Sequence, residues 1–194
     1  GVNDAATIAG DTTGGATEDT SDASGTATVA DTDTGQDSFT ASSGSATYGT
    51  YTMATSGAWA YTLTDSNSAV QALALAATMS DSFAVTSSDG TSQTISITIT
   101  GANDAATIAG DTTGAATEDV STAATGTLTA TDTDTGESSM ADKASTASTY
   151  GTYSMTSGAW TFSLDSTNSA VQALASGSSL SDSLSFASAD GTAQ

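Results

Sequence analysis

The chain has 194 residues, enough for one large domain or two small ones. It carries 22 Asp and Glu residues against one Lys, a formal net charge of −21, and it contains no His, Cys or Pro. This charge excludes nucleic acids and anionic membrane surfaces as partners, because both are bound through cationic side chains, and the lack of Cys excludes disulfides, thiol nucleophiles and the usual zinc sites.

The first hundred or so residues predict short strands separated by turns. Apolar residues alternate with small or hydroxyl residues, as at Trp59, Tyr61 and Leu63, which is the period of a strand. The predicted strands are residues 6–10, 25–30, 38–42, 50–53, 58–63, 82–86 and 92–100. Val70 and Leu73 have helical spacing and predict one helical turn over residues 68–74. Seven short strands in about a hundred residues are typical of an immunoglobulin-like β-sandwich.

The rest of the chain repeats this unit. Residues 3–14 recur unchanged at 103–114, and shorter motifs follow in the same order in both copies. These motifs are Thr-Glu-Asp, Asp-Thr-Asp-Thr-Gly, Tyr-Gly-Thr-Tyr, Gly-Ala-Trp, Ala-Val-Gln-Ala-Leu and Asp-Gly-Thr. A period of about 100 residues is the size of a domain. The sequence therefore predicts an all-β chain of two tandem antiparallel β-sandwiches, repeat 1 at residues 1–101 and repeat 2 at 102–194.

Trp59 and Trp160 could form a platform for sugar binding. Each instead begins an alternating strand with apolar partners on the same face, which favours a place in the core.

Most acidic residues are predicted to lie in loops at the two ends of each sandwich. Antiparallel strands alternate in direction, so successive loops alternate between an upper and a lower pole. In repeat 1 the upper pole receives Asn3, Asp4, Asp31, Asp33 and Asp89, and the lower pole receives Glu18, Asp19, Asp65 and Asp81. Their counterparts in repeat 2 include Glu118 and Asp119 below. Isolated acids such as Asp11, Asp22, Asp37 and Asp142 are interpreted as solvated surface.

The junction between the repeats is predicted to gather acids from both. The residues concerned are Glu18, Asp19, Asp65 and Asp81 from repeat 1 and Asn103, Asp104, Asp132, Asp134 and Asp190 from repeat 2. Such a cluster would repel itself without counter-ions. Calcium accepts six to eight hard oxygen ligands in irregular geometry, whereas magnesium requires a stricter octahedron. The sequence therefore predicts Ca²⁺ sites at the poles, with Asp-x-Asp pairs and the Asn-Asp linkers as ligands.

The ordered motifs resemble the VCBS-type repeats of large bacterial adhesins, including the extender regions of type I secreted, repeats-in-toxin adhesins. The resemblance covers both repeats and implies calcium-dependent, immunoglobulin-like domains in a stalk on the bacterial surface, with a Gram-negative cell as the expected source. The junction is also similar to that of cadherins, in which the linker, the Asp-x-Asp pair and acidic lower-pole loops share calcium. On that pattern Asn103, Asp104, Asp132, Asp134 and Asp190 have the upper-pole role and Glu18 and Asp19 the lower.

Repeat 2 stops at Gln194, which corresponds to Gln93, and has no counterpart of residues 94–101. Either the repeat is cut there or the strand comes from elsewhere, such as another chain. The unpaired edge is expected to make repeat 2 the less stable one.

The predicted function is that of a structural extender stiffened by calcium. Its expected partners are calcium ions and neighbouring repeats of the same chain, in a monomer that does not insert into a membrane. A ligand-binding module for glycan or ice is the alternative, based on the hydroxyl row Thr94, Ser96, Thr98 and Thr100. Catalysis is not expected, because without His or Cys most nucleophile–base pairs cannot form.

Overall fold

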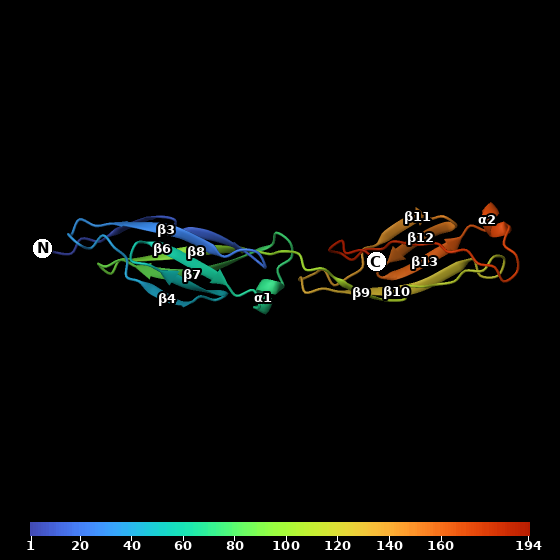
Figure 1. Cartoon of the computed structure of the whole chain (residues 1–194), viewed down its shortest axis with the longest axis horizontal. Helices are drawn as coiled ribbons and strands as arrows, with labels where there is room; N and C mark the ends of the chain where they lie inside the picture. Colours follow the sequence, from blue (N-terminus) through green and yellow to red (C-terminus); the bar gives the residue numbers. More distant parts are fainter. The chain divides into compact units, whose positions relative to one another are not determined.

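The computed structural model describes residues 1–194. The chain divides into two compact units, Gly1–Asn103 (unit 1) and Asp104–Gln194 (unit 2). Each unit consists of strands and one short helix. Figure 1 colours unit 1 from blue to green and unit 2 from yellow to red. No helix in the structure is long and apolar enough to cross a membrane.

Unit 1 is a sandwich of two sheets. The first has the order β1 (Thr7–Gly10), β3 (Ala23–Ala30), β6 (Ala58–Leu63), β5 (Gly49–Met53), β4 (Ser42–Ser45). The second has the order β2 (Thr13–Thr17), β8 (Ser92–Thr100), β7 (Thr78–Thr86). All neighbouring strands are antiparallel except β2 and β8, which are parallel. The predicted β-sandwich is thus confirmed, with one parallel pair added at an edge.

The core of unit 1 lies between the sheets. Trp59 is 2% exposed, and its ring meets that of Phe83 edge-on at 5.9 Å. Its indole Nε1–H donates to the Asp11 carbonyl oxygen at 2.7 Å, so the polar end of the side chain is satisfied as well. A Cβ on Gly25 would lie 2.5 Å from the Trp59 ring, which shows how closely the sheet packs on it. The predicted core position of Trp59 is confirmed, and Trp160 is buried in the same way in unit 2.

A single helical turn, α1 (Ser68–Gln71), lies between β6 and β7. The Asn67 side chain caps it by accepting a hydrogen bond from the Ala69 N–H at 2.9 Å. Val70 on its inner side is fully buried. The helical turn predicted from Val70 and Leu73 is therefore present, with a shorter helix than predicted.

The structure of unit 1 differs from the prediction at the segment 38–42 and at the strand β2. The predicted strand 38–42 is wrong, because Phe39 forms only an isolated bridge with Ser87 and the strand β4 begins at Ser42. The strand β2 was not predicted, since its sequence Thr-Gly-Gly-Ala-Thr has no apolar alternation. It forms because β8 offers a parallel edge.

Unit 2 contains one five-stranded sheet. Its order is β11 (Lys143–Ala147), β12 (Gly151–Thr156), β13 (Ala159–Leu164), β10 (Ala123–Thr131), β9 (Thr107–Gly110), followed in the chain by the helical turn α2 (Ser169–Gln172). Segments 113–117 and 179–187, which correspond to β2 and β7, form only isolated bridges. Trp160, Leu128, Met155 and Phe186 form the centre of the core.

Candidate metal centre

The upper pole of unit 1 joins the N-terminal segment to two loops of the sandwich. In the loop after β3, the Asp33 N–H donates to Asp31 Oδ1 at 2.8 Å. The Asp4 N–H donates to Asp33 Oδ2 at 2.9 Å, and the Ala6 N–H donates to Asp89 Oδ2 at 3.0 Å. The carboxylates therefore hold the backbone that enters β1, and the predicted convergence of these loops is present.

Unit 2 repeats this upper pole. The Asp134 N–H donates to Asp132 Oδ1 at 2.9 Å, and the Asp104 N–H donates to Asp134 Oδ2 at 2.9 Å. The Ala106 N–H donates to Asp190 Oδ2 at 3.2 Å. The recurrence of the same contacts in both copies shows that the Asn-Asp linker and the Asp-x-Asp loop fold together as one structural element. Asn103 itself belongs to unit 1.

Asp89 and Asp190 are fixed by the hairpins in which they lie. Asp89 accepts hydrogen bonds from the hydroxyl groups of Ser87 and Thr91, and Asp190 accepts them from Ser188 and Thr192. These hydroxyl donors, helped by backbone N–H groups, hold the pKa of both carboxyls well below the usual range. Both groups therefore stay ionised and add negative charge to the poles.

Several carboxylate oxygens at the upper poles are buried without a hydrogen-bond donor. They are Asp31 Oδ2 in unit 1 and Asp132 Oδ2, Asp134 Oδ1 and Glu137 Oε2 in unit 2. Asp134 is only 2% exposed. A buried acceptor without a partner is costly, and more so when it carries charge. The one cationic side chain of the protein, Lys143, lies over the Tyr153 ring at 5.3 Å and cannot neutralise all of these groups.

Glu137 belongs to this cluster and was not predicted. Burial raises its pKa, and the charges of Asp134, Asp132 and Asp190 raise it further. The acids of the upper pole of unit 2 thus lie close enough to repel one another. Comparison of the two repeats could not point to Glu137, because its counterpart in repeat 1 is the neutral Gln36.

This arrangement fits a hard divalent cation. The buried atoms without a donor at the upper poles are all carboxylate oxygens, the ligand type that calcium prefers, and they carry the excess charge that a cation would offset. No group of three or more acidic side chains already has the geometry of a coordination sphere. The fit to a calcium ion therefore rests on the type of the ligand atoms, which are carboxylate oxygens, and on their burial.

The lower pole of unit 1 is organised around Glu18, which is 1% exposed. Its Oε1 accepts from Gln71 Nε2 at 3.0 Å, and its Oε2 accepts from the Ala102 N–H at 3.1 Å. The Asp19 N–H donates to Asp65 Oδ1 at 3.4 Å. Glu18, Asp19 and Asp65 therefore lie together, as predicted, and Glu18 holds the start of the linker.

Asp19 has a left-handed backbone with φ of 57°, and Asp119 repeats it at 56°. Asp adopts this conformation more readily than most residues, because its short polar side chain can hydrogen-bond locally. In unit 2 the equivalent of Glu18, Glu118, accepts a hydrogen bond from Gln172 Nε2. The Thr-Glu-Asp motif thus encodes a tight turn in both copies.

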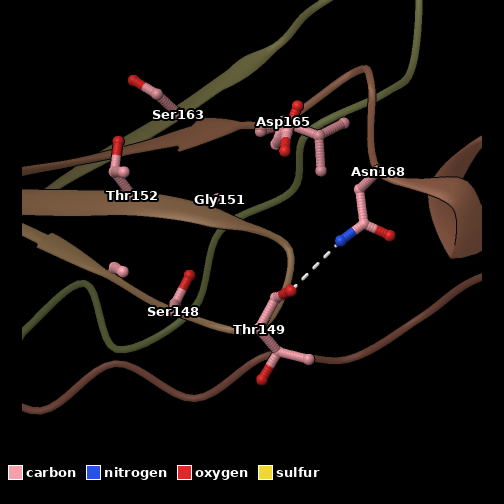
Figure 2. Close-up of a pocket in the computed structure, with 9 residues that line it drawn as sticks. Ser148, Thr149, Gly151, Thr152, Ser163, Asp165 and Asn168 are labelled. Carbon is pink, nitrogen blue, oxygen red and sulfur yellow. Dashed lines mark hydrogen bonds between the residues drawn. The ribbon is translucent and has the colours of Figure 1, made fainter.

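A pocket lined mainly by polar residues lies at the lower end of unit 2. Its volume is about 440 Å³, and it lies between the β11–β12 turn and the segment that leads from β13 into α2. Figure 2 shows the Asn168 amide pointing at Thr149, whose carbonyl oxygen accepts from Asn168 Nδ2 at 3.3 Å. The one carboxylate in its lining, Asp165, accepts from the N–H and hydroxyl of Thr167. Glu118 and Asp119 do not line this pocket, which offers too few charged ligands for a metal ion.

Asp81, predicted as a metal ligand, has a different role. It lies within β7 and accepts hydrogen bonds from the Tyr48 N–H at 2.7 Å, the Ser82 N–H at 2.8 Å and the Tyr61 hydroxyl at 2.8 Å. Burial opposes its ionisation, but these donors outweigh burial and lower its pKa, while burial and Asp81 raise the pKa of Tyr61. We therefore leave Asp81 out of the candidate metal centre.

Three of the acids that were interpreted as solvated surface accept hydrogen bonds from backbone N–H groups. Asp11 Oδ2 accepts from the Thr26 N–H, Asp22 Oδ1 from the Leu63 N–H, and Asp142 Oδ1 from the Ser157 N–H. All three side chains are exposed, yet each accepts from a backbone N–H within or beside a strand. The acidic composition thus serves the sandwich itself as well as its poles.

Comparison with known families agrees with this geometry. Residues 3–101 match the model of the bacterial cadherin-like domain. No curated protein matches the chain.

Proposed function

Because the chain belongs to the bacterial cadherin-like domain family, we propose that it is a two-repeat segment of an adhesin stalk that calcium stiffens. Domains of this family are typical of bacterial surface adhesins and have a structural or adhesive fold. We also propose that these two repeats are extenders, exported to the outside of a Gram-negative cell by type I secretion, which hold a binding domain away from the surface.

The observation that supports a calcium role is the set of buried carboxylate oxygens without donors at the upper poles. In unit 2, Asp132, Asp134 and Glu137 would hold the ion, with Asp104 and Asp190 close by. In unit 1, Asp31 and Asp33 would do so. A bound calcium ion supplies positive charge that offsets the repulsion and links loops that are otherwise joined only by hydrogen bonds.

The linker gives this proposal a mechanical consequence. Glu18 of unit 1 holds the Ala102 N–H, and Asp134 of unit 2 holds the Asp104 N–H. Only residue 103 separates these two anchored positions. We propose that Glu18, Asp19 and Asn103 join the ligands of unit 2, so that the linker loses its freedom when calcium binds.

Calcium would also contribute to folding. Extracellular calcium modules bind with Kd values of about 10⁻⁴ to 10⁻³ M. At free calcium ten- to a hundredfold above Kd, each site adds roughly 1.4–2.7 kcal/mol. A few sites would then match a large part of the stability of a small domain, about 5–15 kcal/mol.

The test compares the chain in millimolar calcium with the chain in chelator. We expect the melting temperature to fall in chelator and small-angle scattering to change from a rod to a flexible particle. The double variant Asp132→Asn, Asp134→Asn should lose much of this response, whereas Asp37→Asn, which removes an exposed charge in the other unit, should keep it. Equal melting and equal scattering in calcium and chelator would disprove the proposal.

The alternative prediction of a glycan- or ice-binding face gains no support. Thr94, Ser96 and Thr98 are exposed on β8, as the outward positions of any strand would be.

A further inference from the structure

An early strand and the last strand of unit 1 lie side by side in one sheet. β2 pairs with β8 in parallel, in a register that runs from Thr13 opposite Ser96 to Thr17 opposite Thr100. Because the strands are parallel, both run toward the lower pole. The chain thus reaches β2 from the upper pole and leaves β8 at the lower pole. A pull on the two ends of unit 1 therefore draws β2 and β8 past each other along their length.

A ladder of backbone hydrogen bonds holds this pair together. The Ser96 N–H donates to the Thr12 carbonyl oxygen at one end, and the Glu18 N–H donates to the Thr100 carbonyl oxygen at the other, both at 3.0 Å. The bonds of a parallel ladder are evenly spaced between such ends. Strands that slide along their length strain all of these bonds at once, whereas strands that are peeled from one end lose them one at a time.

Glu18 strengthens the lower end of the pair. Its backbone N–H binds the last residue of β8, and its buried carboxylate accepts from the Ala102 N–H at 3.1 Å and from Gln71 Nε2 at 3.0 Å. The residue that follows β2 therefore also holds the backbone that follows β8. The segment that leaves unit 1 is fastened to β2 by both the main chain and the side chain of Glu18.

Unit 1 can be extended from its ends by two routes, and both separate β2 from β8. In the first, the N-terminal strands leave the sandwich, which breaks the pairing of β1 with β3 as well as that of β2 with β8. In the second, β8 leaves the sandwich, which breaks its pairing with β7 as well. The β2–β8 pair is the step that the two routes share.

We propose that the parallel β2–β8 pair, together with Glu18, is the element by which unit 1 resists tension. This inference rests on the proposed function, because a stalk that joins a cell to a surface is stretched along its chain. The ladder consists of backbone hydrogen bonds, so the resistance does not require calcium. Its separation sets the rate of forced unfolding, which governs how long the unit stays folded under tension.

The test stretches single molecules of the whole chain in two directions. The sequence has no Cys, so a pair of introduced Cys residues defines the points of attachment. Val2→Cys with Ala105→Cys, both at exposed positions, pulls along the strands. Val2→Cys with Ser92→Cys, at the exposed upper end of β8, peels β8 from that end instead. We expect the unfolding force to be at least about twofold higher along the strands, because that direction strains the whole ladder at once.

Two proline variants test the ladder itself. Every second residue of β2 turns its N–H to β8, so Ala16 shares the orientation of Glu18, and Gly15 turns its N–H away. Proline has no N–H. Ala16→Pro should therefore lower the unfolding force along the strands, whereas Gly15→Pro should leave it unchanged. The Gly15 position has room for the ring, since a Cβ there would meet only the Thr98 carbonyl oxygen, at 4.0 Å.

Each measurement is made in calcium and in chelator. Equal forces in the two directions overturn the inference, as do equal losses of force in the two proline variants. If Ala16→Pro does not fold, the comparison of directions decides alone. A difference between directions that disappears in chelator, in molecules that still unfold with the full gain in length, also overturns the inference but agrees with the proposed role of calcium. A difference that persists while calcium has no effect on melting supports the inference and contradicts calcium stiffening.

Discussion

At the scale of single residues, the two upper poles differ by one carboxylate, Glu137 in unit 2 against Gln36 in unit 1. Glu137→Gln should weaken calcium binding to unit 2 by about tenfold, because the number of charged ligands sets the affinity of such sites. The reciprocal variant Gln36→Glu should strengthen binding to unit 1. Calorimetric titration of both variants measures the change.

The same substitution should have the opposite effect without calcium. Glu137 lies among Asp132, Asp134 and Asp190, whose charges repel its own. Removing its charge should therefore raise the melting temperature in chelator while lowering it in calcium. A melting temperature that moves in the same direction under both conditions would show that Glu137 is not a ligand.

Asp81 provides a pH-dependent prediction of a different kind. Its pKa is lowered on folding from an ordinary value of about 3.9. Its contribution to stability is therefore fully present above the unfolded-state pKa and is lost as the pH falls through the folded-state pKa. Asp81→Asn should destabilise unit 1 by about 1–3 kcal/mol at pH 7 and by less at pH 3.

Denaturant unfolding followed by Trp59 fluorescence, with Trp160→Phe in the background, measures the effect of Asp81→Asn. The loss should be the same in calcium and in chelator, since the donors of Asp81 are Tyr61 and backbone N–H groups. A loss that occurs only in calcium would return Asp81 to the metal centre.

At the scale of elements, alternation predicts the strands that have one face in the core. β6 and β8 have the bounds that the pattern indicates, because every second side chain is buried. β2 could not be predicted, since Gly14 and Gly15 give no pattern and the strand depends on pairing with β8. Phe39 suggested a strand at 38–42, but a single buried aromatic needs only one bridge to hold it.

For the candidate metal centre, the sequence predicts which loops come together but not the contacts of each carboxylate. Loops that follow antiparallel strands must share an end of the sandwich, so the grouping of Asp33 and Asp89 with the N-terminal segment follows from the order of strands. Asp81 was misplaced because β7 begins four residues before the predicted strand at 82, which puts Asp81 inside the sheet. Which oxygens are left without donors depends on packing that spacing alone does not fix.

Glycines at two turns of unit 1 give a matched test of how tightly the β5–β6 hairpin is held. Gly57 and Gly35 both have positive φ, 90° and 82°. A Cβ on Gly57 would lie 2.0 Å from the Ala27 carbonyl oxygen, whereas a Cβ on Gly35 would meet nothing within 4 Å.

Gly35→Ala should cost about 1–2 kcal/mol, the usual cost of a left-handed residue. Gly57→Ala should cost at least about twice as much, because the hairpin must also move away from β3. Chemical denaturation of both variants decides this, and equal losses would contradict it.

At the scale of the whole molecule, the two units differ in the number of sheets and in the apolar side chains that they bury. Unit 1 has two sheets and buries Ile95, Ile97 and Ile99 between them, while unit 2 has a single sheet. Since burial of apolar area is the main favourable contribution to folding, the units should unfold in separate transitions, with unit 2 at the lower temperature.

Two single-tryptophan variants assign the transitions. In Trp160→Phe the remaining Trp59 reports on unit 1, and in Trp59→Phe the remaining Trp160 reports on unit 2, since each indole donates to the carbonyl oxygen of an Asp in its own unit. Each variant should shift mainly the transition of its own unit.

Calcium should raise both transitions, because each unit has an upper pole with buried carboxylate oxygens. A single transition reported equally by both tryptophans would instead mean that the units fold as one cooperative body, and the proposed stalk would then not be a string of independent domains.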